Sequence, residues 1–350
     1  MESLNHFATE LLLLEIERLA PGKCVVMGDV DADDAEAIAY VTGVENTTFI
    51  VRYFGDEQAL RERGLQAQSS WWPARDEEVQ SVVIFHAKER LATDLRVASS
   101  MEAFPNARER FVLGHNKLGI SSVTKRFKGA FQEVDKVGTG RHSAMVRLAK
   151  PVEGAEVLAP QDAWWSQWTL DLGDRSVPLY DLPGVFSRGE LDAGTRMLID
   201  HAPALRGDDV LDLGCGVGTI GIARALKLES AKVVLVDHDF FAISAARRNV
   251  EALGLSDRVS VVYGDIESVR GRRFDSVVTN PPFHQGSEVT TSTTLRWLEK
   301  MKEVLRPGGD LTLVANRFLA YADPLDAAFK QVRVLYEDGK FRLWYARQVR

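Results

Sequence analysis

The feature that most constrains the fold of this 350-residue chain is an apolar segment that runs directly into closely spaced glycines, at residues 210–221. Residues 210–213 have the composition of a buried strand, and Gly214, Gly216 and Gly218 follow. Glycines at such a point let the backbone approach a ligand closely and let the next helix pack against the strand. The segment therefore predicts the first strand, turn and helix of an α/β domain that binds a ligand at this turn.

Four further apolar runs and a terminal hairpin complete the second half of the chain. Helical patterns separate the runs, and alternating strands and helices indicate a parallel sheet with right-handed crossovers. Asp338-Gly339 lies between the last two apolar runs, and such a dipeptide between strands is a strong hairpin signal. We therefore expect a seven-stranded mixed sheet that ends in an antiparallel pair. The predicted strands after the first are 232–237, 259–265, 274–278, 310–315, 332–336 and 341–345.

Acidic side chains stand at the ends of two of these strands, where ligands of open α/β sheets bind. Asp237 follows Asp212 by 25 residues, which suits a carboxylate that holds two ribose hydroxyls. Asp265, next to Ile266, is placed for an adenine amino group. Asp212 itself lies inside the first strand, so we expect it to organise the glycine turn.

The same glycines match the G-x-G-x-x-G pattern of dinucleotide-binding folds, from Gly216 to Gly221. A nicotinamide cofactor is therefore an alternative. Three features argue against it: Asp212 precedes the glycines within the strand, Asp265 ends the third strand, and a hairpin follows the fifth strand. A dinucleotide-binding fold usually continues with parallel strands at that point.

The loop Asn280-Pro281-Pro282-Phe283 follows the predicted strand 274–278. Two consecutive prolines cannot continue a ladder of hydrogen bonds, so the strand must end in a stiff loop. An amide, free backbone carbonyls and an aromatic ring suit a grip on a flat heterocycle by its amino group. The alternative is a proline loop whose phenylalanine lies in the core, and these four residues alone do not decide between the two.

The first half of the chain repeats the alternation of strands and helices without a working glycine turn. Its predicted strands lie within 22–29 and at 48–53, 82–86 and 110–114. The turn at 28–34 is acidic and holds one glycine, whereas a cofactor-binding turn needs several. We therefore expect two domains, 1–160 and 161–350, of which only the second binds a cofactor.

Positive charge gathers at 115–150, which has eight Lys or Arg against two acids in a chain whose net charge is −7. Clusters of this kind bind phosphate backbones, so Lys125, Arg126 and Lys128 are candidates for contact with nucleic acid. The alternative is a solvated face whose charges meet acidic neighbours in the fold.

Phe186 and Arg188 lie in a loop with proline and glycine, just before a helix that we expect Asp192 to cap. We expect this loop to fold over the pocket of the second domain, with both side chains in contact with substrate. For Arg188, a structural salt bridge is an equal alternative.

Composition excludes several classes of protein. No run of about 18 apolar residues is present, so no membrane span is expected, and residues 1–10 lack the pattern of a secretion signal. The two cysteines, Cys24 and Cys215, lie in different predicted domains and support neither a disulfide framework nor a metal cluster. We expect a cytoplasmic monomer without a metal.

Taken together, the glycine turn at 212–218, Asp237, Asp265 and the terminal hairpin resemble the class I S-adenosylmethionine-dependent methyltransferases. The loop 280–283 resembles the Asn/Asp-Pro-Pro-aromatic signature of enzymes that methylate exocyclic or amide nitrogens. The resemblance implies S-adenosylmethionine as cofactor and a planar nitrogen as the methylated atom.

A narrower resemblance covers essentially the whole chain. Residues 184–187, 280–286 and 314–319 resemble segments of the bacterial small-subunit ribosomal RNA guanine-N2 methyltransferases, and 114–122 resembles part of that family's N-terminal domain. This implies two tandem Rossmann-like methyltransferase domains, the first without its cofactor site, and methylation of a guanine N2 in 16S ribosomal RNA.

The resemblance assigns roles to the candidate residues. It implies that the protein's partner is ribosomal RNA, either free or within a small-subunit assembly particle. Around the target nitrogen it places Asn280, Pro281 and Phe283; around the cofactor, Asp212, Gly214, Gly216, Gly218, Asp237, Asp265, Ile266 and Asn280; and toward the substrate, Phe186, Arg188, Lys125, Arg126 and Lys128.

Three alternatives stay open at this point. The large-subunit sister family shares much of the pattern, so the RNA itself is undecided. Protein-glutamine and DNA-adenine methyltransferases share the logic of the Asn280 loop, although the basic stretch 115–150 favours RNA. A non-catalytic RNA-binding ribosome assembly factor would keep the fold without the activity, which the intact glycine turn and the intact Asn280 loop argue against.

Overall fold

The computed structural model describes residues 4–204, 206–281 and 291–348. The chain divides into two units, Met1–Trp165 and Ser166–Arg350, each with its own sheet. The boundary expected from the sequence lay between residues 160 and 161. No helix in the described part of the chain is long and apolar enough to cross a membrane.

Seven strands of the first unit form one sheet in the order β3-β2-β1-β4-β5-β7-β6. β1 to β5 run parallel, and β7 pairs antiparallel with both β5 and β6. The sequence predicts four of these strands but not β3, β6 and β7, because β3 is short and polar and β6 is charged and largely exposed. The strands are β1 (Lys23–Met27), β2 (Thr47–Val51), β3 (Gln66–Ser69), β4 (Val79–Phe85), β5 (Glu109–His115), β6 (Phe131–Gly140) and β7 (Ser143–Pro151).

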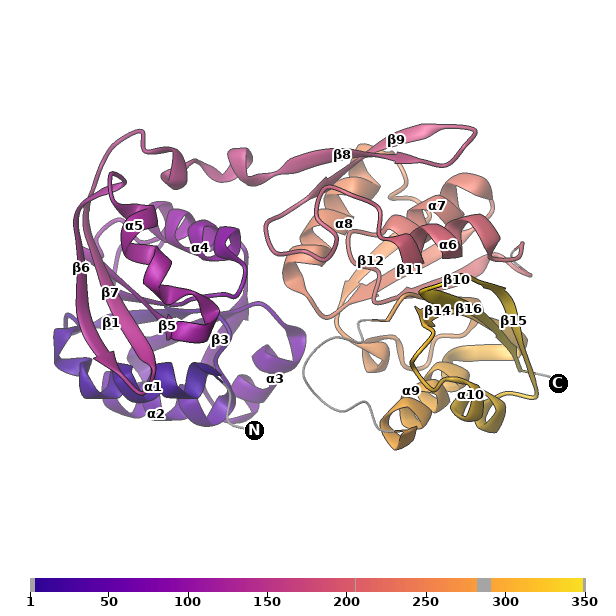
Figure 1. The fold of residues 1–350 in the computed structure, drawn as a ribbon, viewed down its shortest axis with the longest axis horizontal. Helices are drawn as coiled ribbons and strands as arrows, with labels where there is room; N and C mark the ends of the chain where they lie inside the picture. Colours follow the sequence, from indigo (N-terminus) through magenta and orange to yellow (C-terminus); the bar gives the residue numbers. More distant parts are fainter. Residues whose placement is uncertain (1–3, 205, 282–290, 349–350) are drawn as a thin grey trace. The chain divides into compact units, whose positions relative to one another are not determined.

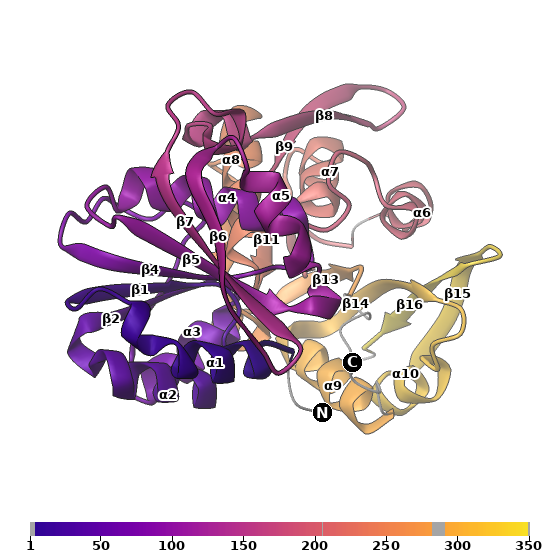
Figure 2. The same cartoon turned by 60° about the vertical axis from the view of Figure 1, so that its left-hand side comes forward.

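Helices cover both faces of the first sheet, as Figures 1 and 2 show. Side chains of a strand alternate between faces. Cys24 and Val26 of β1 accordingly pack with α1, α2 and α3, whereas Val25 and Met27 pack with α4 and α5. The helices are α1 (Leu4–Leu14), α2 (Ala32–Thr42), α3 (Phe54–Glu62), α4 (Arg90–Ala103) and α5 (Val123–Phe127).

The second unit carries a second seven-stranded sheet, in the order β12-β11-β10-β13-β14-β16-β15. β10 to β14 run parallel, and β16 pairs antiparallel with β14 and β15. The predicted architecture of two Rossmann-like domains, the second ending in an antiparallel hairpin, is confirmed. The strands are β10 (Asp209–Leu213), β11 (Lys232–Asp237), β12 (Val259–Tyr263), β13 (Phe274–Thr279), β14 (Leu305–Asn316), β15 (Gln331–Glu337) and β16 (Phe341–Arg347).

Local sequence explains the ends of these strands. Asp338 closes the last hairpin, because its Oδ1 accepts hydrogen bonds from the N–H groups of Lys340 and Phe341, each at 2.7 Å. β14 begins at Leu305, five residues earlier than expected, and its pairing with β13 is irregular between Phe274 and Ser276. The segment 306–309 is therefore the irregular start of a strand.

Two layers of helices also cover the second sheet (Figure 1). Core residues of α6, α7 and α8 pack on one face and those of α9 and α10 on the other. A separate two-stranded hairpin, β8 (Ser166–Asp171) and β9 (Ser176–Asp181), precedes the sheet. The helices are α6 (Ala193–His201), α7 (Thr219–Lys227), α8 (Phe240–Ala252), α9 (Thr291–Val304) and α10 (Ala322–Ala328).

Candidate active site

The glycine turn, Gly214, Gly216 and Gly218, lies between β10 and α7 in a conformation that needs glycine. The three φ angles are 70°, 57° and 89°, in the left-handed region that other residues enter only with strain. A Cβ atom on Gly216 would meet no atom within 4 Å, so this part of the backbone faces open space. The turn thus presents bare backbone to a ligand.

Gly221 fixes the helix behind the turn. A Cβ atom on Gly221 would lie 2.2 Å from Cδ2 of Leu235 in β11, so only glycine lets α7 approach the sheet this closely. The N–H of Gly221 donates to Oδ2 of Asp212 at 2.7 Å. Asp212 is fully buried, and burial raises the pKa of its carboxyl to about 7. Asp212 therefore anchors the start of α7 from beneath, and it does not line the pocket.

Asp237 joins the end of β11 to the glycine turn. Its Oδ2 accepts the N–H of Gly216 at 2.8 Å and its Oδ1 accepts the N–H of Asp239 at 2.9 Å. Burial, and then the neighbouring charge of Asp239, raise the pKa of this carboxyl. Each carboxylate oxygen keeps a second lone pair, so Asp237 can still accept hydrogen bonds from a ligand.

The structure places Asp265 and Ile266 just after β12, the next strand in the sheet. Asp265 is exposed and caps a short helical turn, because its Oδ1 accepts the N–H of Glu267 at 2.9 Å. Ile266 is buried. Neither residue lines the pocket at the glycine turn, and neither does Asp237; Asp265 and Ile266 follow β12, which pairs with the strand that ends at Asp237.

Asn280 stands directly after β13, on the wall of the same pocket as Gly214 and Gly216. Its Nδ2 donates to Oδ2 of Asp192 at 2.9 Å and to Oγ1 of Thr195 at 3.0 Å. The same Oδ2 of Asp192 accepts the N–H of Thr195 at 3.0 Å, so the predicted cap of α6 is confirmed. The amide of Asn280 is thus tied to the first turn of α6.

The rest of the Asn280 loop is described only in part. Pro281 is buried. Phe283, predicted to stack on the base, lies outside the described residues, as does His284. The start of the loop is anchored by Thr279, whose Oγ1 donates to the carbonyl oxygen of Leu213 at 2.7 Å. This bond joins the carboxyl ends of β13 and β10.

The loop before α6 contributes one of its two predicted side chains to the pocket. Phe186 lines the pocket and is 66 % exposed. Arg188 is held elsewhere, since its Nε donates to Oγ of Ser166 at 3.1 Å and lies 3.4 Å from the buried Asp181. The salt-bridge alternative for Arg188 therefore describes its position in the structure.

Half of the basic side chains in 115–150 are already paired with acids. Arg126 lies 2.5 Å from the buried Asp94, and Arg147 pairs with three acids. Arg141 and Lys150 also have acidic partners. Lys125 and Lys128 are exposed, and within the described ranges they form no ion pair, as is also true of Lys117 and Lys136.

Two contributors to the site were not expected from the sequence. Thr195 accepts a hydrogen bond from the same Asn280 amide as Asp192 does, although Thr195 and Asn280 are 85 residues apart in the chain. Asn249 of α8 holds the turn from behind, because its Nδ2 donates to the carbonyl oxygens of Val217 and Tyr180. An asparagine inside a helix gives no local signal for such a contact.

In the described ranges, no group of His, Cys, Asp or Glu could hold a metal ion.

Comparison with known proteins agrees with this geometry. A family model described as methyltransferase small domain matches residues 176–345, and its N-terminal counterpart matches residues 9–168. A protein of Hahella chejuensis named ribosomal RNA small subunit methyltransferase C is 36% identical to this chain, over 83% of this chain and 82% of the relative. A protein of the same name in Pseudoalteromonas atlantica is 31% identical, over 97% of this chain and 99% of the relative.

A solved structure has the same fold. It is the 16S rRNA N2 methyltransferase RsmC of T. thermophilus in complex with AdoMet and guanosine, with a TM-score of 0.80 and 22% identity. The match covers 97% of this chain and 91% of that one. The two family models, which together cover most of the chain, therefore define a methyltransferase. More narrowly, this chain belongs to the ribosomal RNA small subunit methyltransferase C family.

Proposed function

We propose that this protein transfers the methyl group of S-adenosylmethionine to the exocyclic N2 amino group of a guanine in 16S ribosomal RNA. Relatives over most of the chain are named for the small-subunit RNA, and the neighbour of the same fold is described with AdoMet and guanosine. The observation that carries the proposal is the tethered amide of Asn280, which shares one pocket with the glycine turn.

The residues around the glycine turn fit S-adenosylmethionine, which supplies an electrophilic methyl group when it is bound. The glycine turn admits its methionine portion, since a Cβ atom on Gly216 would meet no atom within 4 Å and a ligand can approach the backbone closely there. Asp237 accepts hydrogen bonds from the ribose with the lone pairs that its two backbone partners leave free. Asp265 and Ile266, which follow β12, hold the adenine.

Asn280 and Pro281 act on the target nitrogen. The lone pair of a guanine amino group is delocalised into the ring, so the amine is a weak nucleophile. Oδ1 of Asn280 and the carbonyl oxygen of Pro281 each accept one of its hydrogens, which aims the lone pair at the methyl group and stabilises the developing positive charge. As the N–C bond forms, the S–C bond breaks with its electrons on sulfur, and the nitrogen then loses a proton to water. Phe283 stacks on the base.

Asp192 and Thr195 set the direction of the Asn280 amide. An ionised carboxylate has no proton to donate, so only Nδ2 can face Oδ2 of Asp192. Oδ1 is then the group left for the substrate, and it has no hydrogen-bond partner among residues 4–204, 206–281 and 291–348. A freely rotating amide would present Nδ2, a donor, to an amine that needs an acceptor.

The first test is Asn280→Ala. We expect the rate of methyl transfer to 16S ribosomal RNA to fall at least about 100-fold, because a preorganised partner of the developing charge is lost. Binding of S-adenosylmethionine, measured by calorimetry, should stay close to that of the wild type. A near wild-type rate with intact cofactor binding would contradict this scheme.

A matched variant separates orientation of the amide from simple structural support. Asp192→Asn keeps the shape of the side chain but can donate, so the Asn280 amide loses its fixed direction. We expect kcat to fall about tenfold with little change in the KM for S-adenosylmethionine. In the Asn280→Ala background the same change should have no further effect, since the pair acts as one unit. If Asp192→Asn lowered kcat equally in the wild-type protein and in the Asn280→Ala variant, Asp192 would support the site by capping α6 and not by orienting the Asn280 amide.

Contacts with the RNA are assigned to both units in this proposal. Lys125 and Lys128 carry exposed charge without an acidic partner in the described ranges, which suits phosphate binding. The exposed ring of Phe186 meets the target nucleotide at the pocket. The partner is ribosomal RNA, free or within a small-subunit assembly particle, and the enzyme acts in the cytoplasm as a monomer.

A further inference from the structure

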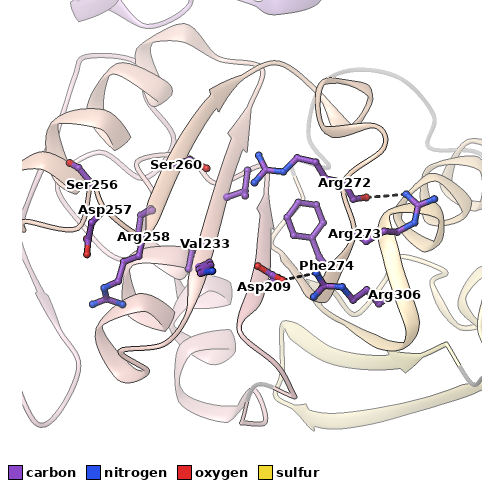
Figure 3. A pocket seen from close by; sticks show the side chains of 13 residues that line it. Asp209, Val233, Ser256, Asp257, Arg258, Ser260, Arg272, Arg273, Phe274 and Arg306 are labelled. Atoms are coloured by element: carbon purple, nitrogen blue, oxygen red, sulfur yellow. Dashed lines mark hydrogen bonds and ion pairs between the residues drawn. The ribbon is translucent and has the colours of Figure 1, made fainter.

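A second hollow lies at the opposite edge of the catalytic sheet, where β10, β11, β12, β13 and β14 begin. It has a volume of about 430 Å³, and Figure 3 shows the side chains around it. The glycine turn and Asn280 follow the carboxyl ends of β10 and β13, whereas this hollow is lined by residues at or just before the first positions of the strands. It is therefore a separate feature from the cofactor pocket.

Five basic side chains line this hollow, and they come from four different places along the chain: the starts of β11 and β14 and the residues just before β12 and β13. They are Lys232, Arg258, Arg272, Arg273 and Arg306. Their clustering is not explained by the charge of the unit, because residues 166–350 contain 24 Lys or Arg and 25 Asp or Glu. We call these five side chains the basic cleft.

Most of the positive charge in the basic cleft has no acidic partner. Arg306 holds the two nearest carboxylates, with Nη2 at 2.7 Å from Asp209 and Nη1 at 2.8 Å from Asp275. The third acid nearby, Asp257, is exposed. Within the part of the chain that the structure describes, Lys232, Arg258, Arg272 and Arg273 form no ion pair. The hollow thus keeps a net positive charge.

Three of the arginines are held in place without being neutralised. Nη1 of Arg258 donates to the carbonyl oxygens of Ala225 at 2.5 Å and Leu228 at 3.2 Å. The guanidinium of Arg272 lies 5.6 Å from the centre of the Phe274 ring, and Nη1 of Arg273 donates to the carbonyl oxygen of Arg272 at 3.0 Å. Each guanidinium has five N–H donors, so donors remain for a ligand, and side chains that are already ordered lose less entropy when they bind one.

The lining selects phosphate rather than a base. Arginine matches the geometry of phosphate oxygens, and the hydroxyls of Ser256 and Ser260 add donors. Phe274, the aromatic residue of the hollow, is 2 % exposed and offers no face for a base to stack on. A free nucleotide would need such an apolar surface for its base. We infer that the basic cleft binds the phosphate backbone of the RNA substrate, outside the region of the target guanine.

This inference rests on the proposed function, since it takes RNA as the substrate, and it adds a requirement on the length of that RNA. Strands of five and six residues separate the two edges of the sheet by roughly 16–20 Å. A single nucleoside at Asn280 cannot reach that far. Only an RNA that extends around the second unit can occupy the pocket and the basic cleft together.

The test is a double charge reversal, Arg272→Glu with Arg273→Glu, because both side chains are exposed and far from the pocket. The matched control is Lys330→Glu with Arg333→Glu, which changes net charge equally at exposed positions of the same unit. Binding of a 16S ribosomal RNA fragment is measured by fluorescence anisotropy at several salt concentrations, without methyl transfer. Binding of S-adenosylmethionine and of guanosine is measured alongside.

We expect the cleft variant to bind the RNA at least about tenfold more weakly than the control at ~0.1 M salt. Its slope of log K against log salt should be smaller by about 1.5, which is two phosphate contacts at roughly 0.7–0.9 each. Affinities for S-adenosylmethionine and guanosine should be unchanged. Equal RNA affinity and slope in the two variants would overturn the inference.

Two further outcomes are distinguished by the same measurements. If GMP or pyrophosphate protects the wild type against thermal unfolding and the cleft variant loses that protection while its RNA affinity stays at the control level, the ligand is a free phosphate compound and the RNA inference is wrong. If the cleft variant loses RNA affinity but the wild type methylates no RNA, the inference stands and the proposed function fails.

Discussion

The two units of this protein have sheets of the same topology, but different residues follow the carboxyl ends of their strands. Numbered by rank within each seven-stranded sheet, the strands run 3-2-1-4-5-7-6 in both. The start of the first helix differs. α2 is capped by Asp31, whereas α7 follows Gly218 with φ of 89°. The shared scaffold thus supports a cofactor turn in one unit and not in the other.

In the first unit, a buried side chain packs against the glycine that follows β1. Arg96 of α4 is buried; its Nη1 donates to the carbonyl oxygen of Phe85 at 3.0 Å and its Nη2 to Oδ1 of Asp29 at 3.1 Å. A Cβ atom on Gly28 would lie 2.9 Å from Nη1 of Arg96. In the second unit, a Cβ atom on Gly216 of the glycine turn would meet no atom within 4 Å.

Equivalent positions can be matched through the backbone. Gly28 donates its N–H to Ile50, and Gly214 donates its N–H to Val236, so the next residues, Val51 and Asp237, correspond. Asp237, which we propose binds the ribose, thus corresponds to a buried valine in the first unit. The comparison shows that the sheet is kept when buried apolar residues stand in place of polar site residues. The fold alone therefore does not determine the chemistry.

The largest effect is expected when the second unit is made like the first at this position, with Asp237→Val. The variant loses two hydrogen bonds to a charged acceptor, each worth about 1.5–3 kcal/mol, so the Kd for S-adenosylmethionine should rise at least about 100-fold by calorimetry. Asp237→Asn keeps an acceptor for the N–H of Gly216 and should lose less. Unchanged affinity in a folded Asp237→Val protein would remove Asp237 from the site and weaken the comparison.

An intermediate effect is expected from pH, with opposite signs in the two units. His86 stands directly after β4, as Asn280 stands after β13, but it is 1 % exposed. Its Nε2 bonds to the carbonyl oxygen of Leu118 at 3.1 Å and its Nδ1 to Oγ1 of Thr93 at 3.0 Å. Burial, and then the charge of Arg126, lower the pKa of His86 to about 4.

Because the unfolded chain protonates this histidine near pH 6.5, the stability that neutral His86 gives should fall as pH drops from about 6.5 to 4, by up to roughly 3 kcal/mol. Asp212, whose pKa is raised to about 7, acts in the other direction and gains stability as pH falls from 7 toward 4. Urea unfolding at pH 7 and 4.5 checks both signs, with His86→Gln and Asp212→Asn as the variants that remove each dependence. The same pH dependence in His86→Gln as in the wild type would refute the assignment.

The smallest effect is expected from the exposed lysines of the first unit. Lys125→Ala with Lys128→Ala should weaken binding of 16S ribosomal RNA about threefold to fivefold and reduce its salt dependence by one to two phosphate contacts. Arg126→Ala should instead lower the melting temperature, because it leaves the buried Asp94 without its partner, and should not change RNA affinity of the folded protein. If Arg126→Ala weakened RNA binding more than the lysine pair did, the division of roles in this segment would be wrong.

The sequence predicts the second sheet better than the first for a physical reason. Strands buried on both faces are continuous apolar runs, such as 233–236, and all seven strands of the second sheet are predicted. β3 has the sequence QAQS, and β6 contains three charged residues and buries only two of its ten positions, so their pairing comes from neighbours and not from their own composition. The missed hairpin β6–β7 then places Arg147 among three acids, which removes charge that the sequence alone assigns to RNA.

The candidate site shows the same limit. The glycine turn and the cap at Asp192 are local patterns and could be found by spacing. The second role of Asp192, which holds Asn280 from 88 residues away, depends on how α6 packs beside the end of β13. Local capping rules explain why an acid precedes the helix, but they do not indicate which side chain comes to share it.

The two sheets exchange no strand, and this has a consequence for synthesis of the chain. All seven strands of the first sheet lie before residue 152, and all seven of the second lie after residue 208. The ribosome releases the N-terminal residues first, and domains generally fold as units during translation. The first sheet can therefore close, with Arg96 already seated against Asp29, before the glycine turn has been made. A nascent chain of this protein therefore completes its first sheet before the strands of its second sheet exist.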